Sequence, residues 1–154
     1  MGGVVNSIMA AQLEIVYNGT SSDIAKGTGL TFGTTVYNVA DPTPGTGTTS
    51  PVIGVVACAD HEQDFIGVAR EILKAGSCGI MCRKGKCECL FPASGACTAG
   101  DAIVCNSSGT FVTQNTDVSD KAGIVLETFT SLSAAALKWC YITDQQGALG
   151  RKAS

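Results

Sequence analysis

Cysteine is the residue type in this sequence that offers the most chemistry. The eight cysteines are Cys58, Cys78, Cys82, Cys87, Cys89, Cys97, Cys105 and Cys140, and four of them fall within residues 77–90. Three states are open to them: thiolate ligands of zinc, partners in disulfides, or small apolar side chains of a core. Their spacing and their neighbours distinguish these states.

A zinc site needs paired thiolates that reach one tetrahedral centre. Residues 78–89 offer four thiols, but gaps of three, four and one residues separate them, whereas strong zinc motifs repeat a Cys-x-x-Cys pair. The only histidine, His61, is distant in the sequence. The pattern disfavours zinc, so we expect no metal and no other cofactor. A small zinc-binding module on these residues is kept as an alternative.

An even number of cysteines permits disulfides but does not define their pairing. Cys82 and Cys87 are the candidate disulfide, provided that strands at residues 78–83 and 86–91 form a hairpin. Oxidation would have to occur outside a reducing cytosol. A secreted, disulfide-stapled β-rich domain that binds a ligand or a carbohydrate is therefore an alternative function.

The residues around the cysteines favour burial. Cysteines alternate with apolar residues in two predicted strands, at Cys78, Ile80 and Cys82 and at Cys87, Cys89 and Phe91. A free cysteine behaves as a small hydrophobe in such positions. We therefore interpret the cysteines chiefly as core residues.

Other groups that could support catalysis are sparse. His61 lies in a charged turn and is the only histidine available as a base. The Gly27-Thr28-Gly29 segment is not followed by the Gly-Lys-Ser/Thr of a phosphate-binding loop, and no G-x-S-x-G elbow occurs. The sequence predicts no catalytic residues and no enzyme.

The charge of the chain is low in amount and slightly negative in sign. Charged residues make up 15% of the sequence and the net charge is −3, so the electrostatic footprint of a nucleic-acid-binding protein is missing. No apolar run is long enough to span a membrane. A surface poor in charge is typical of one that partners cover. We expect neither nucleic acid nor membrane as a partner.

The elements that must position these residues are strands. Alternating or continuous apolar runs predict strands near residues 13–17, 26–40, 52–58, 65–70, 78–83, 86–91, 94–114, 121–129 and 137–142. Residues 131–136 are the one expected helical turn, and three of the four prolines fall in a loop at residues 41–51. The composition and this pattern indicate a mainly β fold.

A weak internal repeat organises these strands. Residues 64–71 resemble residues 120–127, and each segment is preceded by a glycine-bearing turn and followed by a strand that contains cysteine. Gly67 and Gly123 match and mark a bulge or a close backbone approach. We expect an N-terminal arm at residues 1–20 and a compact β-barrel or sandwich at residues 21–142. Its two modules would span about 26–91 and 94–142, and residues 143–154 would be a polar tail.

Residues 79–142 resemble the head decoration (cement) proteins of tailed bacteriophages. The resemblance rests on Gly85, Ser94-Gly95-Ala96, Thr98-Ala99-Gly100-Asp101, Gly123-Ile124-Val125-Leu126-Glu127 and the closing strand Trp139 to Ile142. It implies a β-barrel or β-tulip-like protein that assembles, commonly as a homotrimer, on the outer surface of the capsid. Its partners would be the major capsid protein and other copies of itself, and its location would be the virion. The cysteines depart from the family's usual Val or Ile.

Two segments are candidates for contact with the capsid or a neighbouring copy. The first is the N-terminal segment, and the second is the proline-rich loop at residues 41–51. Their candidate contact residues are Val4, Val5, Ile8, Leu13, Ile15, Pro42 and Pro44.

Overall fold

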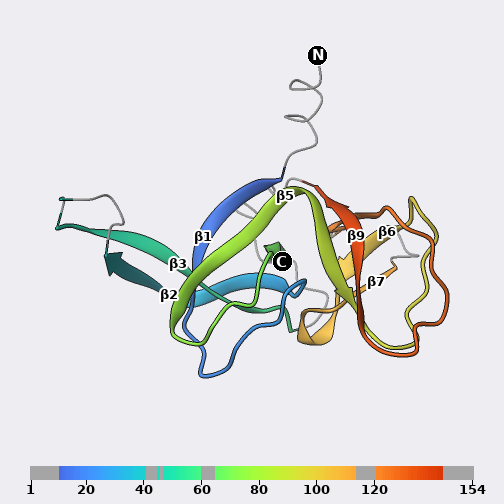
Figure 1. Ribbon diagram of the computed structural model, residues 1–154, viewed down its shortest axis with the longest axis horizontal. Coiled ribbons are helices and arrows are strands. Elements are labelled where there is room, and N and C mark those ends of the chain that lie inside the picture. The colour runs from blue at the N-terminus through green and yellow to red at the C-terminus, as the bar shows by residue number, and fades with distance from the viewer. Residues whose placement is uncertain (1–10, 41–44, 46, 60–64, 114–120, 144–154) are drawn as a thin grey trace, which may run out of the picture.

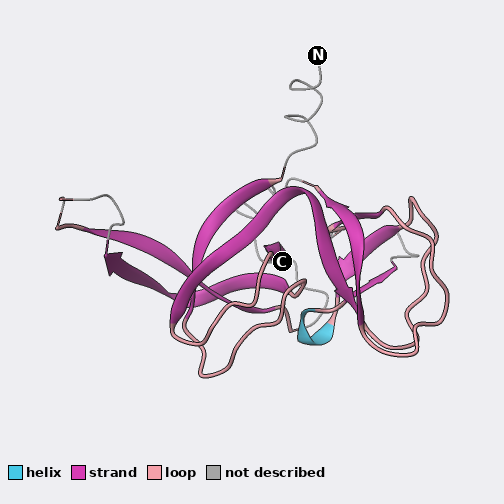
Figure 2. Ribbon diagram, in the orientation of Figure 1, coloured by secondary structure: helices cyan, strands magenta, loops and turns pink. Residues whose placement is uncertain are grey.

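The computed structural model describes residues 11–40, 45, 47–59, 65–113 and 121–143. Within these residues the chain is built almost entirely of strands, with one short 3-10 turn (Figures 1 and 2). The elements are β1 (Gln12–Asn18), β2 (Gly29–Ala40), β3 (Thr49–Ala57), β4 (Phe65–Ala69), β5 (Ser77–Phe91), β6 (Ala102–Cys105), η1 (Ser107–Gly109), β7 (Phe111–Thr113), β8 (Gly123–Val125) and β9 (Ala136–Ile142).

Five strands close into a mixed barrel. They follow the order β1-β3-β2-β4-β5, and β5 pairs again with β1. The β1–β3 pair is parallel and the other pairs are antiparallel. Closure leaves the barrel without a free edge strand. The prediction of a mainly β, barrel-forming fold is confirmed.

The strand β5 is continuous over 15 residues, so the hairpin expected within residues 78–91 is wrong. Its first part pairs with β1, as at Cys82 opposite Leu13, and its second part pairs with β9, as at Lys86 opposite Tyr141. Between them lies Gly85, with a φ of 106°, a conformation that glycine adopts readily. The basic run that suggested a turn is therefore a bend between two parts of the sheet.

The helical turn expected at residues 131–136 is also wrong. That segment is irregular until β9 begins, and Ser131 has a φ of 29°. Backbone hydrogen bonds hold it against the loop at residues 92–95, including one of 2.7 Å from the amide of Ser94 to the carbonyl of Leu132. Alanine-rich composition favoured a helix, but these tertiary hydrogen bonds decide the conformation.

The strands β6 to β9 repeat the pairing of the barrel strands. In the barrel, Ile15 of β1 is opposite Ile80 of β5, and beyond the bend Glu88 of β5 is opposite Trp139 of β9. We call β1 to β4 with residues 77–84 of β5 repeat 1. Residues 85–91 of β5 with β6 to β9 are repeat 2.

The correspondence between the repeats holds along the chain. The following pairs in repeat 1 and repeat 2 match: Leu30–Ala57 with Ile103–Thr113, Gly29–Val68 with Ala102–Ile124, and Ile24–Leu73 with Cys97–Phe129. The amide of Gly27 donates to the carbonyl of Ala69 at 2.8 Å, and that of Gly100 donates to Val125 at 2.8 Å. The repeat of strand modules is thus present, and its join falls at Gly85.

The repeats differ mainly in the length of one hairpin. β2 has 12 residues and β3 has nine, whereas β6 has four and β7 has three. The extra length of β2 and β3 extends beyond the barrel as a two-stranded ribbon (left of Figure 1), while β6, β7 and β9 lie at the opposite end. The proline-rich loop expected at residues 41–51 overlaps the ends of β2 and β3, and most of it lies outside the described residues.

Each repeat has its own core, made by matching residues. Repeat 1 buries Val16, Ile24, Leu30, Val55, Ile66, Ala69, Leu73 and Met81, and the residues at the same places in repeat 2 are Cys89, Cys97, Ile103, Phe111, Ala122, Val125, Phe129 and Cys140. Phe65, Val68 and Cys82 belong to repeat 1 but pack in the core cluster of repeat 2, and so join the two repeats. The aromatic rings Phe65 and Phe111 meet edge to face, with centroids 5.8 Å apart.

The N-terminal segment at residues 1–20 is not an arm along its whole length. Residues 12–18 form β1, an integral barrel strand whose Val16 is fully buried. The buried Asn18 side chain donates to the carbonyls of Leu73 (2.8 Å) and Ser22 (2.9 Å), so this polar group is satisfied inside the fold. Residues 1–10 lie outside the described part, as do residues 144–154 of the expected polar tail.

Candidate interaction surface

Seven of the eight cysteines are buried. All eight are free thiols, and all but Cys78 are buried. The interpretation of the cysteines as core residues is confirmed for these seven. It is wrong for Cys78, which is exposed with Ile80 on the outer face, because the alternation of the strand buries positions 79 and 81 instead. Cys82 is buried because a register shift beside Arg83 breaks the alternation.

The repeat explains why several cysteines are where they are. Cys89 occupies the place of Val16, Cys97 that of Ile24, and Cys140 that of Met81. These positions require an apolar side chain of modest size, which cysteine supplies. No special chemistry is needed to account for them.

Cys82 and Cys87 are close neighbours although the segment that contains them is one continuous strand and not a hairpin. Their thiols are hydrogen-bonded across the bend at Gly85. This hydrogen bond, a second from Cys89 and the positive charge of Arg70 lower the pKa of Cys87 to about 5. The same hydrogen bond and burial raise the pKa of Cys82. Both cysteines are free in the structure. No group of three or more His, Cys, Asp or Glu side chains in the described part of the chain is arranged to hold a metal ion.

The outer face of β1 and β5 in repeat 1 carries a small apolar hollow. Leu13 and Ile15 of β1 are 49% and 56% exposed, and Ile80 on β5 is 36% exposed. Together with Glu14 they line a hollow of about 110 Å³. Their exposure follows from the strand alternation, because Val16 on the other face of β1 is in the core. Exposed apolar side chains gathered on one face are typical of an interaction surface.

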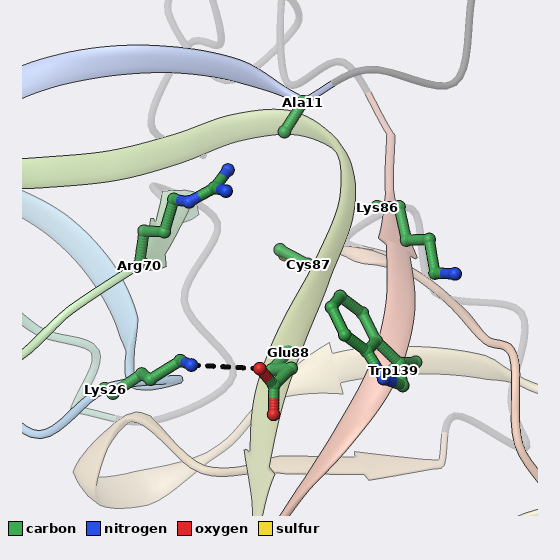
Figure 3. Close-up of a pocket in the computed structure, with 7 residues that line it drawn as sticks. All are labelled: Ala11, Lys26, Arg70, Lys86, Cys87, Glu88 and Trp139. Atoms are coloured by element: carbon green, nitrogen blue, oxygen red, sulfur yellow. Dashed lines mark hydrogen bonds and ion pairs between the residues drawn. The ribbon is translucent and has the colours of Figure 1, made fainter. Parts of the chain in front are cut away.

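The same place in repeat 2 carries a larger, charged pocket (Figure 3). The residues that match Leu13, Glu14, Ile15 and Ile80 are Lys86, Cys87, Glu88 and Trp139, and all four line it. Ala11, Lys26 and Arg70 of repeat 1 complete the lining, and the pocket volume is about 330 Å³. The two hollows therefore lie at equivalent places in the two repeats, but one is lined by apolar side chains and the other by charged ones.

The charges in this pocket are only partly paired. Lys26 Nζ lies 2.9 Å from Glu88 Oε1, and the Lys86 ammonium lies 4.8 Å from the centroid of the Trp139 ring. Arg70 follows β4 directly, and its guanidinium extends into the space above Cys87 (Figure 3). Trp139 is 41% exposed, so it offers an aromatic wall to an incoming group.

The contact residues expected from the sequence have different outcomes. Leu13 and Ile15 are exposed on the outer face of β1. Val4, Val5, Ile8, Pro42 and Pro44 lie outside the described residues, as does His61. Ile80, Arg70 and Trp139 were missed. Alignment of the strand pairing in the two repeats could have identified Ile80 and Trp139, because it places them at matching positions.

The remaining motifs have structural roles. Gly27, in the segment tested as a phosphate-binding loop, has a φ of 84° and forms the turn into β2. Gly67 lies against β5, where an added Cβ would be 2.6 Å from the carbonyl oxygen of Cys82. Its match Gly123 would meet the carbonyl oxygen of Tyr141. The expected close backbone approach is thus found at both glycines. Among the described residues, none belongs to a helix with the length and apolarity needed to cross a membrane.

Comparison with known proteins gives a likeness of fold. No protein-family model and no curated protein sequence matches the chain. Among solved structures, the fold is similar to the head fiber gp8.5 N base of bacteriophage phi29, with a TM-score of 0.56 and 16% sequence identity. The match covers 87% of this chain and 95% of the other. The chain therefore has the fold of a phage head fiber base.

Proposed function

We propose that this protein is a structural subunit attached to the outer surface of a tailed-phage head. The observation that carries the proposal is the fold likeness to a head fiber base, which extends over 87% of this chain. The resemblance of residues 79–142 to head decoration proteins points to the same location. The more specific proposal is a decoration protein that binds the major capsid protein and stabilises contacts between its subunits.

The exposed apolar hollow of repeat 1 supports this role. Leu13, Ile15 and Ile80 form a contiguous face on two paired strands of a closed barrel. Burying a fully exposed side chain of this size contributes about 1.5–3 kcal/mol, and Leu13, Ile15 and Ile80, which are 36–56% exposed, would each contribute about half of that. A few such contacts give only modest affinity to one copy, but many copies on a lattice stabilise the shell that they bind, by mass action.

We extend the proposal to the assembly state. The resemblance implies a homotrimer, and several linked copies would bind the lattice more tightly than one through a high effective concentration. Sedimentation velocity of the full chain tests this part separately. A trimer is expected, and a monomer at all concentrations would contradict the trimer without contradicting attachment to the head.

Co-sedimentation of the full chain with expanded, undecorated shells tests the proposal. The shells should come from the phage that encodes this protein, with unexpanded shells and bovine serum albumin as controls. We expect saturable binding to the expanded shells. Failure to bind either kind of shell would contradict the proposal.

A matched pair of variants tests the role of the apolar face. Leu13→Ser with Ile15→Ser should weaken binding by at least about tenfold, because two apolar side chains no longer leave water on binding. Ile124→Ser with Leu126→Ser is the control, since Ile124 and Leu126 are also partly exposed apolar residues, at 38% and 37%, but lie on and directly after β8 of repeat 2. Equal losses in the two variants would contradict the assignment of this face. Thermal unfolding checks that both remain folded.

A further inference from the structure

We propose that the charged pocket of repeat 2 binds a carboxylate side chain from an acidic segment of the shell protein. The inference rests on the proposed function for its partner. Its chemistry comes from the pocket itself, which is lined by Lys26, Arg70, Lys86, Glu88 and Trp139.

The balance of charge in the pocket favours a single negative group. Three cations line it, and Lys26 is already paired with Glu88 at 2.9 Å. In the described part of the chain neither Arg70 nor Lys86 forms an ion pair with a carboxylate. The lining therefore carries three positive side chains against the single carboxylate of Glu88, and this excess of positive charge favours an anionic group. Among the described lining residues, Arg70 and Lys86 are the two cations that remain available to a carboxylate.

The shape of the pocket suits an amino-acid side chain. Its volume of about 330 Å³ lies at the small end of ligand-binding cavities. A guanidinium such as that of Arg70 can donate two parallel hydrogen bonds to a carboxylate. The exposed ring of Trp139 can pack against the methylene groups that carry the carboxylate. The Arg70 guanidinium and the Trp139 ring border the same space (Figure 3).

Comparison with repeat 1 indicates that the charged residues of the pocket are not needed for folding and are available to bind a partner. Lys86 and Glu88 occupy the places of the exposed residues Leu13 and Ile15. The fold alone tolerates apolar residues there. Charged groups collected in a hollow give specificity for a partner of complementary charge. The two faces would thus contact the shell in different ways, one through apolar burial and one through a carboxylate.

Trp139 makes the pocket directly observable, because it is the only tryptophan of the chain. The probe is an end-capped peptide of three glutamates, with a peptide of three glutamines as its uncharged match. Titration at low salt should give a saturable change in tryptophan fluorescence with the glutamate peptide and no such change with the glutamine peptide. Added NaCl should reduce the affinity, since the interaction is between charges.

Arg70→Gln and Lys74→Gln provide matched variants. Each removes one positive charge, but Lys74 lies outside the pocket, 3.1 Å from Asp23. Arg70→Gln should weaken binding of the glutamate peptide by about tenfold, as expected for a lost charge-assisted hydrogen bond. Lys74→Gln should leave it near the wild-type value. An equal response to both peptides, no response at all, or equal effects of the two variants would overturn the carboxylate site.

The shell experiment separates this inference from the proposed function. If the wild-type protein and Arg70→Gln bind expanded shells equally well, the pocket is not a shell contact, and the proposed function stands. If the wild-type protein does not bind shells, the proposed function fails and the assigned partner fails with it, whatever the peptide result.

Discussion

At the scale of single residues, the cysteines show how one amino acid serves two purposes. Cys89 and Cys140 pack in the core of repeat 2 at the places of Val16 and Met81. Cys87 differs, because hydrogen bonds from the Cys82 and Cys89 thiols, together with the charge of Arg70, lower the pKa of its thiol beside a pocket. Burial and neighbouring charge, rather than sequence spacing, decide which role each thiol has.

Replacement of Cys89 tests its role in the core. Cys89→Val should change the free energy of unfolding by less than about 1.5 kcal/mol, because valine is the residue at the matching place and the volume is nearly conserved. Cys89→Ser should destabilise by about 1–3 kcal/mol more, since a hydroxyl loses more hydration on burial than a thiol, and the weak thiol partners Cys87 and Cys140 do not offset that loss. Urea unfolding under reducing conditions measures both. Equal stabilities of the two variants would contradict the assignment of Cys89 to the apolar core.

The titration of Cys87 tests the electrostatics of the pocket. Its pKa of about 5 means that the thiolate predominates above that pH, whereas burial and Asp101 raise the pKa of Cys97 to about 11. Absorbance at about 240 nm, where a thiolate absorbs and a thiol does not, should therefore rise between about pH 4 and pH 6.5 in the wild-type protein and not in Cys87→Val. A rise confined to pH values above about 8 would contradict the lowered pKa.

At the scale of elements, β5 links the two repeats. Its halves pair with β1 and β9, and its glycine-bearing bend allows one strand to serve both. Gly67 and Gly123 let β4 and β8 approach the strands that follow them at matching places. In both repeats the fold therefore requires a residue without a side chain at this place, so that the two neighbouring strands can approach each other.

Gly123→Ala tests this requirement. The added Cβ would meet the carbonyl oxygen of Tyr141, so we expect a loss of at least about 2–3 kcal/mol in the free energy of unfolding. Gly45→Ala is the control, since Gly45 has open space around it but a φ of 82°. Its cost should be only the 1–2 kcal/mol or so of that conformation. A smaller effect at Gly123 than at Gly45 in chemical denaturation would contradict the close approach.

The sequence predicted elements that depend on local period and missed those that depend on distant contacts. Alternation placed Cys87, Cys89 and Phe91 on one buried face, because a strand repeats every two residues. The hairpin at residues 78–91 was wrong because Gly85 permits a bend as readily as a turn. The pocket joins Arg70 to Trp139 through a register that only the folded sheet defines.

At the scale of the whole molecule, one strand architecture occurs twice with two different outer faces. Repeat 1 exposes Leu13, Ile15 and Ile80, and repeat 2 exposes Trp139 beside charged groups. Both faces lie on paired strands of one continuous sheet. Such a molecule is suited to make two unlike contacts with a large assembly, which agrees with the proposed role on a phage head.

Cryo-electron microscopy of expanded shells mixed with the full chain tests the central claim most directly. The account predicts ordered density for this fold on the outside of the shell, with Leu13, Ile15 and Ile80 at the contact with capsid subunits. Shells without added density would contradict the account, as would bound copies whose β1–β5 face points to solvent.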